Sequence, residues 1–172
     1  MKKSILVTAV AGSGKSTVCK ALTALGRDAV DIEALPNLFE LVHEETGKPM
    51  PHGWNSHELI KQVDWNCKKD NMRRIIASQK SELTFYCGAM SNFREVWDLF
   101  DGVIVLTVSD ETTVKRLSTR KPGQFGHMAK TRQWVLSWKR ELEDEWLAMG
   151  AIAVSGEPEP TAVAKAIIET CS

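Results

Sequence analysis

Short apolar runs alternate along the chain with longer segments in which apolar residues recur every three or four positions. The runs predict buried strands at residues 5–7, 29–32, 83–87, 103–108 and 151–154. The segments between them predict helices at about residues 15–25, 68–80, 91–99, 110–120, 129–149 and 161–170. Strands that alternate with helices form parallel βαβ units, so the pattern predicts an α/β fold. We expect a three-layer sandwich in which helices cover both faces of a parallel five-stranded sheet.

The stretch between the second and third predicted strands is less regular. Three apolar residues after residue 36 are spaced as on one face of a helix, and we expect a helix there: Leu38, Leu41 and Val42. Glycine and proline interrupt residues 44–57, which predicts a surface loop. Ser56 or Asp64 is expected to cap a short helix beyond it.

The segment after the first strand has the composition of a phosphate-binding loop. Gly12, Gly14 and Lys15 stand between an apolar run and a helical pattern, as in the Walker A pattern G-x-x-x-x-G-K-[ST]. The first glycine of the pattern is replaced by Ala9, a change that a residue with negative φ tolerates. In such a loop backbone N–H groups point inward at a helix N-terminus and bind anions. We expect ATP phosphates to bind a set of consecutive residues: Ala11, Gly12, Ser13, Gly14, Lys15, Ser16 and Thr17.

Within this loop, two side chains have specific expected roles. The Lys15 ammonium can reach the β- and γ-phosphates, and the Ser16 hydroxyl can bind Mg²⁺. The sequence therefore predicts a nucleotide-binding site at the end of the first strand.

Charge and composition argue against several classes of protein. The 172 residues include 22 basic and 22 acidic side chains, so no overall field draws the chain to nucleic acid or to a membrane surface. No stretch approaches the roughly 20 apolar residues that span a bilayer. The four cysteines lack C-x-x-C spacing, which argues against a zinc site and predicts a reducing, cytoplasmic location. Residues 2–11 mimic a short signal peptide, but cleavage there would remove the phosphate loop.

Two charged pairs are candidates for catalysis. Asp31 and Glu33 alternate with Ile32 at the end of the second strand, so both are expected to point to one side at the ligand-binding edge of the sheet. Capping of the following helix is the alternative role for these carboxylates. Arg116 and Arg120 lie four residues apart on one helix face, and guanidinium groups hold phosphate oxygens bidentately. Their alternative is a solvated helix surface.

Taken together, these motifs resemble the small P-loop kinases, such as shikimate kinase, gluconate kinase and adenylate kinase. The matching segments are residues 9–17, 31–33, 87–89 and 116–120. The resemblance implies the strand order 2-3-1-4-5, an acceptor-binding insert at about residues 37–64 and a mobile lid at about residues 119–130. The length suits a single domain over residues 1–172.

The resemblance also implies roles for individual residues. Mg·ATP would be the phosphoryl donor, and the catalytic residues would be Lys15, Asp31, Arg116 and Arg120. Asp31 would join Ser16 at the metal, and Pro158 would lie beside adenine. The acceptor would contact Glu33, Gly88 and Trp65, with His52 and Trp54 nearby in the same insert. The tryptophans of the long helix, Trp134, Trp138 and Trp146, are assigned to the core instead.

The sequence therefore predicts an ATP-dependent kinase that transfers phosphate to a small metabolite resembling a nucleoside, nucleotide or sugar. One alternative is a nucleic-acid 5′-hydroxyl kinase, which charge neutrality disfavours. Another is an ATP-binding regulator or ATPase without a small-molecule acceptor. The expected partners are ATP and the acceptor, and the sequence leaves a monomer or a homodimer open.

Overall fold

A parallel sheet of five strands forms the centre of the protein. The computed structural model describes residues 2–50 and 56–171. The strands β1 (Lys3–Thr8), β2 (Asp28–Asp31), β5 (Leu83–Cys87), β6 (Gly102–Thr107) and β7 (Ile152–Ser155) pair in the order β2-β5-β1-β6-β7, and every pairing is parallel. Counted along the chain within this sheet, the order is 2-3-1-4-5. The predicted fold class and strand order are confirmed.

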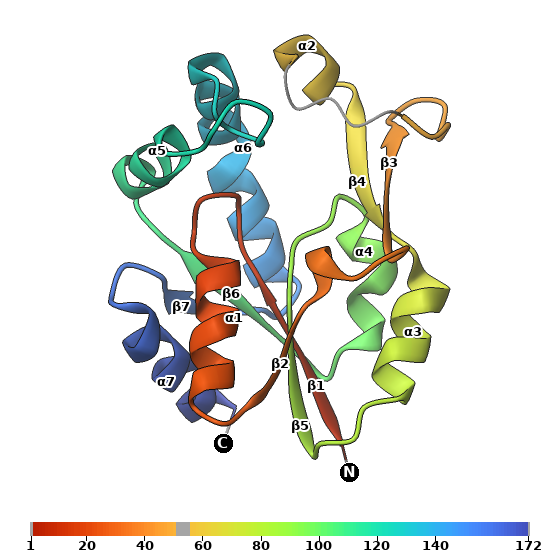
Figure 1. Ribbon diagram of the computed structural model, residues 1–172, viewed down its shortest axis with the longest axis vertical. Coiled ribbons are helices and arrows are strands. Elements are labelled where there is room, and N and C mark those ends of the chain that lie inside the picture. The colour runs from red at the N-terminus through yellow and green to blue at the C-terminus, as the bar shows by residue number, and fades with distance from the viewer. Residues whose placement is uncertain (1, 51–55, 172) are drawn as a thin grey trace.

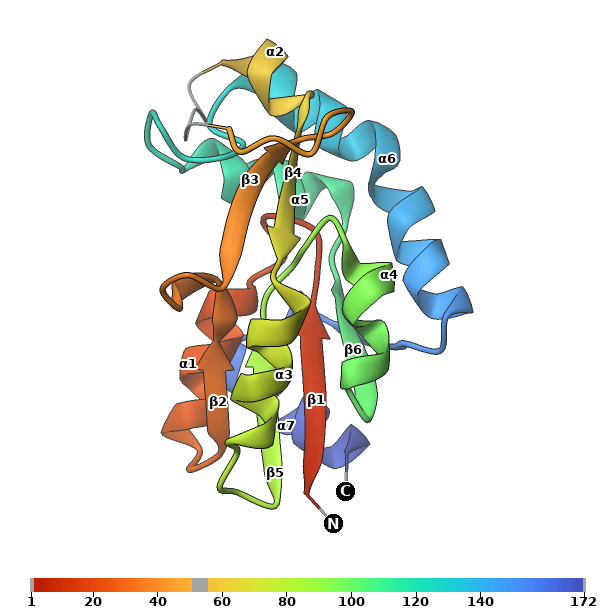
Figure 2. The same cartoon turned by 90° about the vertical axis from the view of Figure 1, so that its right-hand side faces the viewer.

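Helices cover both faces of the sheet because its buried strands are apolar on both sides (Figures 1 and 2). On β1, Ile5 and Val7 pack against α1 (Lys15–Ala24) and α7 (Pro160–Thr170). The intervening Leu6 belongs to the opposite core, with α3 (Lys69–Ala77), α4 (Phe93–Val96) and α6 (Ala129–Ala148). A three-residue 3-10 turn, η2 (Trp97–Leu99), extends α4. This two-sided burial produces the three-layer arrangement.

The insert between β2 and α3 differs from the prediction. Residues after Pro36 form strand β3 (Phe39–His43) rather than a helix, and β3 pairs antiparallel with β4 (Val63–Cys67). Short apolar runs are ambiguous between helix and strand, and here pairing with β4 decides the outcome. Asp64 lies within β4 and caps no helix. Ser56 does cap α2 (His57–Ile60), where its hydroxyl accepts a hydrogen bond from the Leu59 N–H.

The insert and the connection between α5 (Asp110–Ser118) and α6 extend beyond the carboxyl edge of the sheet. Figures 1 and 2 both show α2 and this connection on the same side of the molecule. The insert touches the start of α6, because the ring Nδ1 of His57 lies 3.0 Å from the Thr131 hydroxyl and the ring packs edge-on against Trp134. Residues 51–55, which include His52 and Trp54, lie outside the described part of the chain.

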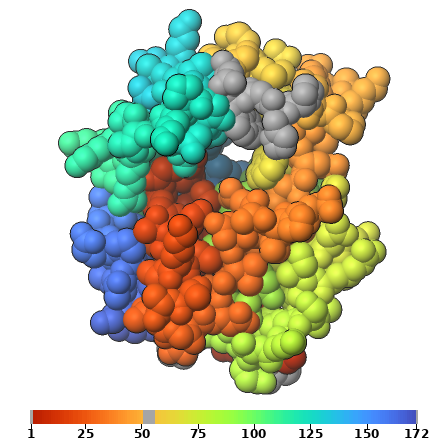
Figure 3. Space-filling view, in the orientation of Figure 1, coloured from red at the N-terminus to blue at the C-terminus, as the bar shows by residue number. Residues whose placement is uncertain are grey.

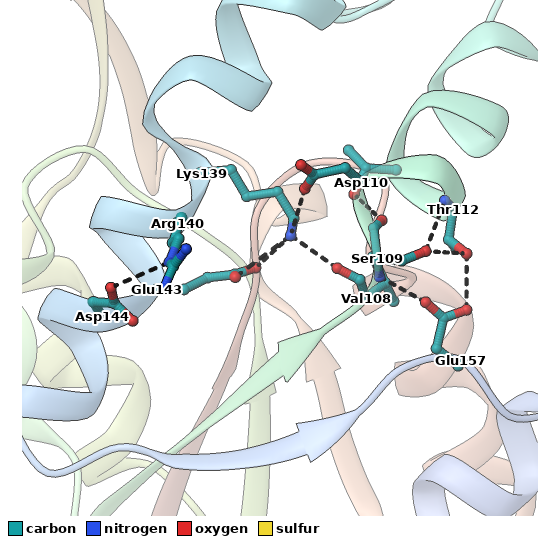
Figure 4. A network of polar contacts seen from close by, with 10 residues as sticks. Val108, Ser109, Asp110, Thr112, Lys139, Arg140, Glu143, Asp144 and Glu157 are labelled. Atoms are coloured by element: carbon teal, nitrogen blue, oxygen red, sulfur yellow. Dashed lines mark hydrogen bonds and ion pairs between the residues drawn. The ribbon is translucent and has the colours of Figure 1, made fainter.

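A buried lysine fastens the long helix α6 to the end of β6 (Figure 4). The Lys139 ammonium donates a hydrogen bond to the Val108 carbonyl at 2.8 Å and lies 3.3 Å from carboxylate oxygens of Asp110 and Glu143. Desolvation raises the pKa of Glu143, and the neighbouring Lys139 charge opposes this shift. Ser109 caps α5 through the Thr112 N–H, as predicted. The base of the α5–α6 unit is therefore held rigidly against the sheet.

In the part of the chain that the structure describes, no helix combines the length and the apolar character needed to cross a bilayer.

A substitution at Gly88 tests the packing at the end of β5. A methyl group at this position would lie 2.4 Å from Ile32 Cγ1, closer than packed atoms approach. We expect Gly88→Ala to lower the free energy of unfolding by about 1–3 kcal/mol, as overpacking does, in denaturant titrations. Gly102→Ala is the matched control, because its methyl would meet only the rotatable Cδ1 of Ile5, at 3.1 Å. Equal losses in the two variants would contradict this account.

Candidate active site

The loop between β1 and α1 has the backbone geometry of a phosphate-binding nest. Gly12 and Gly14 have φ of +87° and +95°, a left-handed conformation that glycine adopts without strain. A methyl group at Gly12 would lie 3.0 Å from Leu117 Cγ, so this glycine also lets α5 pack directly on the loop. Ala9 is buried and does not have a positive φ, which explains why it replaces glycine there. The substitution in the Walker A pattern therefore leaves the loop geometry intact.

Ser13 and Lys15 place polar groups inside this nest. Ser13 is fully buried, and its hydroxyl has no hydrogen-bond partner among the described residues. Lys15 is half-buried and donates a hydrogen bond from Nζ to the Ala9 carbonyl at 3.0 Å. Desolvation lowers the pKa of Lys15, while the charges of Glu33 and Asp31 partly oppose that shift. A buried hydroxyl and a desolvated cation, which forms no ion pair with any described carboxylate, suit an anionic ligand.

A first cavity of about 550 Å³ opens over this loop. Residues 12–18 form one wall, and the turn between β7 and α7, including Pro158, forms the other. Arg116 crosses between them, with Nη2 donating to the Gly156 carbonyl at 3.0 Å. Gly156 also lets the turn approach the phosphate loop, because a methyl group on Gly156 would lie 3.0 Å from the Ser13 carbonyl oxygen. The predicted adenine-side residue Pro158 and the predicted loop residues from Gly12 to Thr17 thus share one cavity, whereas Ala11 lines the second.

Glu157 ties the β7–α7 turn to α5 on the rim of this cavity (Figure 4). Its carboxylate accepts hydrogen bonds from the Ser109 N–H at 2.6 Å and from the Thr112 hydroxyl at 2.8 Å. The Ser109 N–H bond, supported by Thr112, lowers the pKa of Glu157. The turn and the start of α5 therefore hold a fixed relative position.

A second cavity of about 480 Å³ lies between the insert, the α5–α6 connection and α6. Figure 3 shows an opening between the red phosphate-loop region and the teal connection above it. The walls of the second cavity are mainly apolar and aromatic. Their larger side chains include Trp65, Met90, Phe125, Trp134, Trp138, Leu142 and Trp146. This cavity has the size and lining of a small-molecule site.

Three charged side chains line both cavities: Lys15, Glu33 and Arg120. Glu33 Oε1 accepts a hydrogen bond from the Ala89 N–H at 2.6 Å, and Arg120 Nη1 donates to the Phe125 carbonyl at 2.7 Å. Desolvation lowers the pKa of Arg120, and the Glu33 charge opposes this. The two cations and one carboxylate therefore form a charged wall shared by two otherwise separate spaces.

The acidic pair does not lie as the strand pattern predicts. Strand β2 ends at Asp31, and Ile32–Ala34 forms a short 3-10 turn, η1, so strand alternation does not orient Glu33. Glu33 lines both cavities, whereas Asp31 lines neither, although its charge acts on Lys15. Asp31 occupies the cap position of this turn without a side-chain cap hydrogen bond, and Glu33 lies in its first turn.

The predicted acceptor residues are only partly brought together. Trp65 lines the second cavity, but Gly88 lines neither cavity. Gly88 instead gives room to Ile32, whose side chain would collide with any larger residue. Trp146 is buried, as expected of a core residue, yet it and the less buried Trp134 and Trp138 also line the second cavity. Their spacing on α6 indicated an apolar face, but nothing in the sequence indicated that the face borders a cavity.

The oxygen ligands near the loop fit Mg²⁺ bound mainly through phosphate. Among the described residues, no three His, Cys, Asp or Glu side chains gather closely enough to hold a metal ion. Mg²⁺ characteristically keeps several waters and takes only one or two protein oxygens beside substrate phosphates. The exposed Ser16 hydroxyl at the start of α1 and the nearby Asp31 carboxylate offer a set of that kind.

Solved structures of small-molecule kinases share this fold. A gluconokinase from Sinorhizobium meliloti 1021 is 19% identical with a TM-score of 0.52, and the match covers 98% of this chain and 95% of that one. A shikimate kinase from Acinetobacter baumannii, in complex with shikimate, is 17% identical with a TM-score of 0.59 and coverages of 99% and 93%. A deoxyadenosine kinase from M. mycoides is 15% identical with a TM-score of 0.56 and coverages of 98% and 97%. These likenesses establish the fold.

The sequence itself also matches a family. No curated protein matches it. A family model described as an AAA domain matches residues 5–124, which include the phosphate loop, the insert, Arg116 and Arg120. The chain therefore belongs to this AAA domain family and has the fold of the P-loop nucleotide and small-molecule kinases.

Proposed function

We propose that this protein is an ATP-dependent phosphotransferase that moves the γ-phosphate of Mg·ATP to a hydroxyl of a small metabolite. The observation that carries the proposal is the charged wall of Lys15, Glu33 and Arg120, which borders both cavities. A kinase needs its donor and acceptor in adjoining spaces with positive charge where they meet. A protein that only bound ATP would have no use for the second space.

The first cavity holds the nucleotide. The loop amides and Ser13 bind the phosphates, Lys15 and Arg116 neutralise their charge, and the turn that carries Pro158 borders adenine. Bound at Ser16 and Asp31, Mg²⁺ supplies further positive charge to the phosphate oxygens. The Arg116 contact to Gly156 and the unpartnered Ser13 hydroxyl support this assignment.

The acceptor occupies the second cavity with its hydroxyl at the shared wall. The hydroxyl oxygen forms a bond to the γ-phosphorus, the bond from that phosphorus to the β–γ bridging oxygen breaks, and ADP leaves. Glu33 receives the hydroxyl proton, while Lys15 and Arg120 stabilise charge on the transferred group. Glu33 is favoured over Asp31 for the proton because Asp31 lines neither cavity.

The insert at residues 37–64 and the segment at residues 119–130 enclose the acceptor as parts of one domain over residues 1–172. The contacts of His57 with Thr131 and Trp134 join the insert to the start of α6, directly after this segment. Arg120 links the segment to the reaction centre through its bond to the Phe125 carbonyl. Closure of this segment over bound ATP therefore excludes water from the transferred phosphate.

The structure disfavours nucleic acid as the acceptor. Three of the four basic residues in α3 and its approach have acidic neighbours: Lys68 lies 3.9 Å from Glu40, Lys69 lies 2.8 Å from Asp98, and Arg73 lies 2.6 Å from Asp70. The fourth, Arg74, donates a hydrogen bond to Asn71 Oδ1 at 3.3 Å. These pairs leave little unbalanced positive charge for a phosphate backbone. The four cysteines are free thiols, which suits a reducing cytoplasm.

A coupled assay for ADP release tests the proposal directly. The purified protein with Mg·ATP is screened against sugars, sugar acids, nucleosides and nucleoside monophosphates. Calorimetry measures Mg·ATP binding in parallel. We expect heat of binding with Mg·ATP and ADP release that depends on one class of acceptor. Binding of Mg·ATP with no acceptor-dependent release would favour an ATP-binding regulator instead.

Replacing Lys15 by methionine separates stability from ligand binding. Because desolvation lowers the pKa of Lys15, its protonated form carries a cost at neutral pH that methionine avoids. We expect Lys15→Met to raise the melting temperature of the nucleotide-free protein, with the gain shrinking as pH rises through the lysine pKa in the fold. The variant should lose the stabilisation by Mg·ATP that wild type shows.

Thermal unfolding with and without Mg·ATP measures both effects. Lys20→Met, which removes an exposed lysine from the same helix, is the control and should keep the Mg·ATP shift. A full Mg·ATP shift in Lys15→Met would remove this lysine from the site.

A pair of carboxylate variants distinguishes the roles of Glu33 and Asp31. Glu33→Gln keeps the shape of the side chain but removes the proton acceptor, so we expect kcat to fall about 100-fold or more. Asp31→Asn should mainly weaken the response to Mg²⁺, and excess Mg²⁺ should restore much of its activity. Steady-state rates at several Mg²⁺ concentrations measure both. If Asp31→Asn shows the larger, Mg²⁺-independent loss, the roles are reversed.

A further inference from the structure

The second cavity has an uneven distribution of charge. Among the described residues that line it, the charged side chains are Lys15, Glu33 and Arg120, and all three belong to the wall shared with the nucleotide. The remaining walls carry apolar, aromatic or uncharged polar side chains. A molecule in this space therefore meets charge at one end only.

The far walls present flat aromatic surfaces. Trp134 and Trp138 pack edge to face with ring centroids 5.5 Å apart, and Trp65 is held by stacking on Phe39 at 5.0 Å. These contacts fix the rings without filling the cavity. Preorganised indole faces bind other flat rings by offset stacking.

Two tryptophans that line the cavity carry buried donors that the described protein atoms do not use. The indole N–H groups of Trp138 and Trp146 are buried, and neither has a hydrogen-bond partner among the described residues. A buried donor normally finds a partner, because leaving it unpaired is costly. A rotation of the indole that turns its N–H into the cavity would let an uncharged acceptor atom on a bound ring satisfy such a donor.

Nearby cations are engaged outside the cavity. Arg94 ion-pairs with Glu145 and lies over the Phe93 ring, and it does not line the cavity. Arg132 donates to the Gly126 carbonyl at 3.2 Å and does not line it either. An anionic group carried by an acceptor would thus enter the apolar end without a counter-charge, which is unfavourable.

Resting on the phosphotransferase function proposed above, we infer that the acceptor is an uncharged alcohol with a flat apolar ring. The ring lies among Trp65, Trp134 and Trp138, a ring oxygen or nitrogen accepts from the indole N–H of Trp138 or Trp146, and the hydroxyl faces Glu33. Sugar acids and nucleoside monophosphates are rejected, because their second anionic group would be buried without a partner.

Matched pairs of compounds test this inference. Each pair contains an uncharged ring alcohol and a counterpart that differs by one anionic group: thymidine and thymidine monophosphate, adenosine and AMP, and benzyl alcohol and 4-(hydroxymethyl)benzoate. Transfer of labelled γ-phosphate gives kcat/KM for each. We expect the uncharged member to be favoured by about 100-fold or more in at least one pair. Preferred phosphorylation of the anionic members would overturn the inference while leaving the kinase function intact.

Two variants place the effect in this cavity. Trp138→Phe keeps an aromatic face but removes the N–H donor, so we expect the acceptor KM to rise about three- to tenfold with little change in kcat. Leu142→Arg places a cation on the apolar wall and should shift the preference towards the anionic member of the pair. Trp97→Phe is the control, since Trp97 lies outside the cavity and packs on Phe93.

The two proposals fail in different ways. Tryptophan fluorescence measures binding of both members of each pair in the presence of a non-hydrolysable ATP analogue, independently of turnover. Tighter binding of the uncharged member without phosphate transfer would overturn the kinase function and retain an uncharged-ring site. An unchanged KM in Trp138→Phe, together with an unshifted preference in a folded Leu142→Arg, would overturn the inference.

Discussion

Three glycines allow the elements around the first cavity to pack closely against one another. Gly12 lets α5 pack on the phosphate loop, and Gly14 leaves room for the Arg116 guanidinium, which would lie 3.3 Å from a methyl group there. Gly156 brings the β7–α7 turn to the Ser13 carbonyl from the other side. A Cβ at any of these glycines would crowd its neighbour, so the phosphate loop, α5 and the β7–α7 turn pack closely around the first cavity. Arg116 also donates a hydrogen bond to the Gly156 carbonyl, which links α5 to the β7–α7 turn.

The same elements connect to the more distant parts of the site. The prediction that Arg116 and Arg120 share one helix face is wrong, because α5 ends at Ser118 and Arg120 lies beyond it. The hydrogen bond from Arg120 to the Phe125 carbonyl holds its guanidinium group at the edge of the second cavity. Lys139 meanwhile fastens the middle of α6 to the end of β6, so the tryptophans on both sides of it in α6 take their position from the sheet. The two cavities thus keep a fixed relation to each other. The position of a molecule in the second cavity relative to one in the first therefore depends on several elements together and not on a single residue.

The second cavity illustrates how an insert defines specificity on a common fold. The sheet and phosphate loop follow a shared plan, whereas the cavity is walled by the β3–β4 pair, the α5–α6 connection and one face of α6. The lining of the second cavity is rich in indole rings and largely uncharged, unlike the charged wall that it shares with the first cavity. In the function proposed above, acceptor recognition and phosphate transfer use separate surfaces that meet at Glu33 and Lys15.

The sequence by itself determined the features that depend on local patterns. Apolar periodicity predicted the five-stranded sheet, and glycine spacing at Gly12 and Gly14 predicted the loop, because both follow from neighbouring residues. Only the tertiary structure decided the rest. Residues 39–43 became a strand because β4 pairs with them, and Glu33 came to face both cavities because β2 ends early in a 3-10 turn. The tryptophans of α6 line a cavity because the insert stands opposite them, a long-range arrangement that no local pattern in the chain encodes.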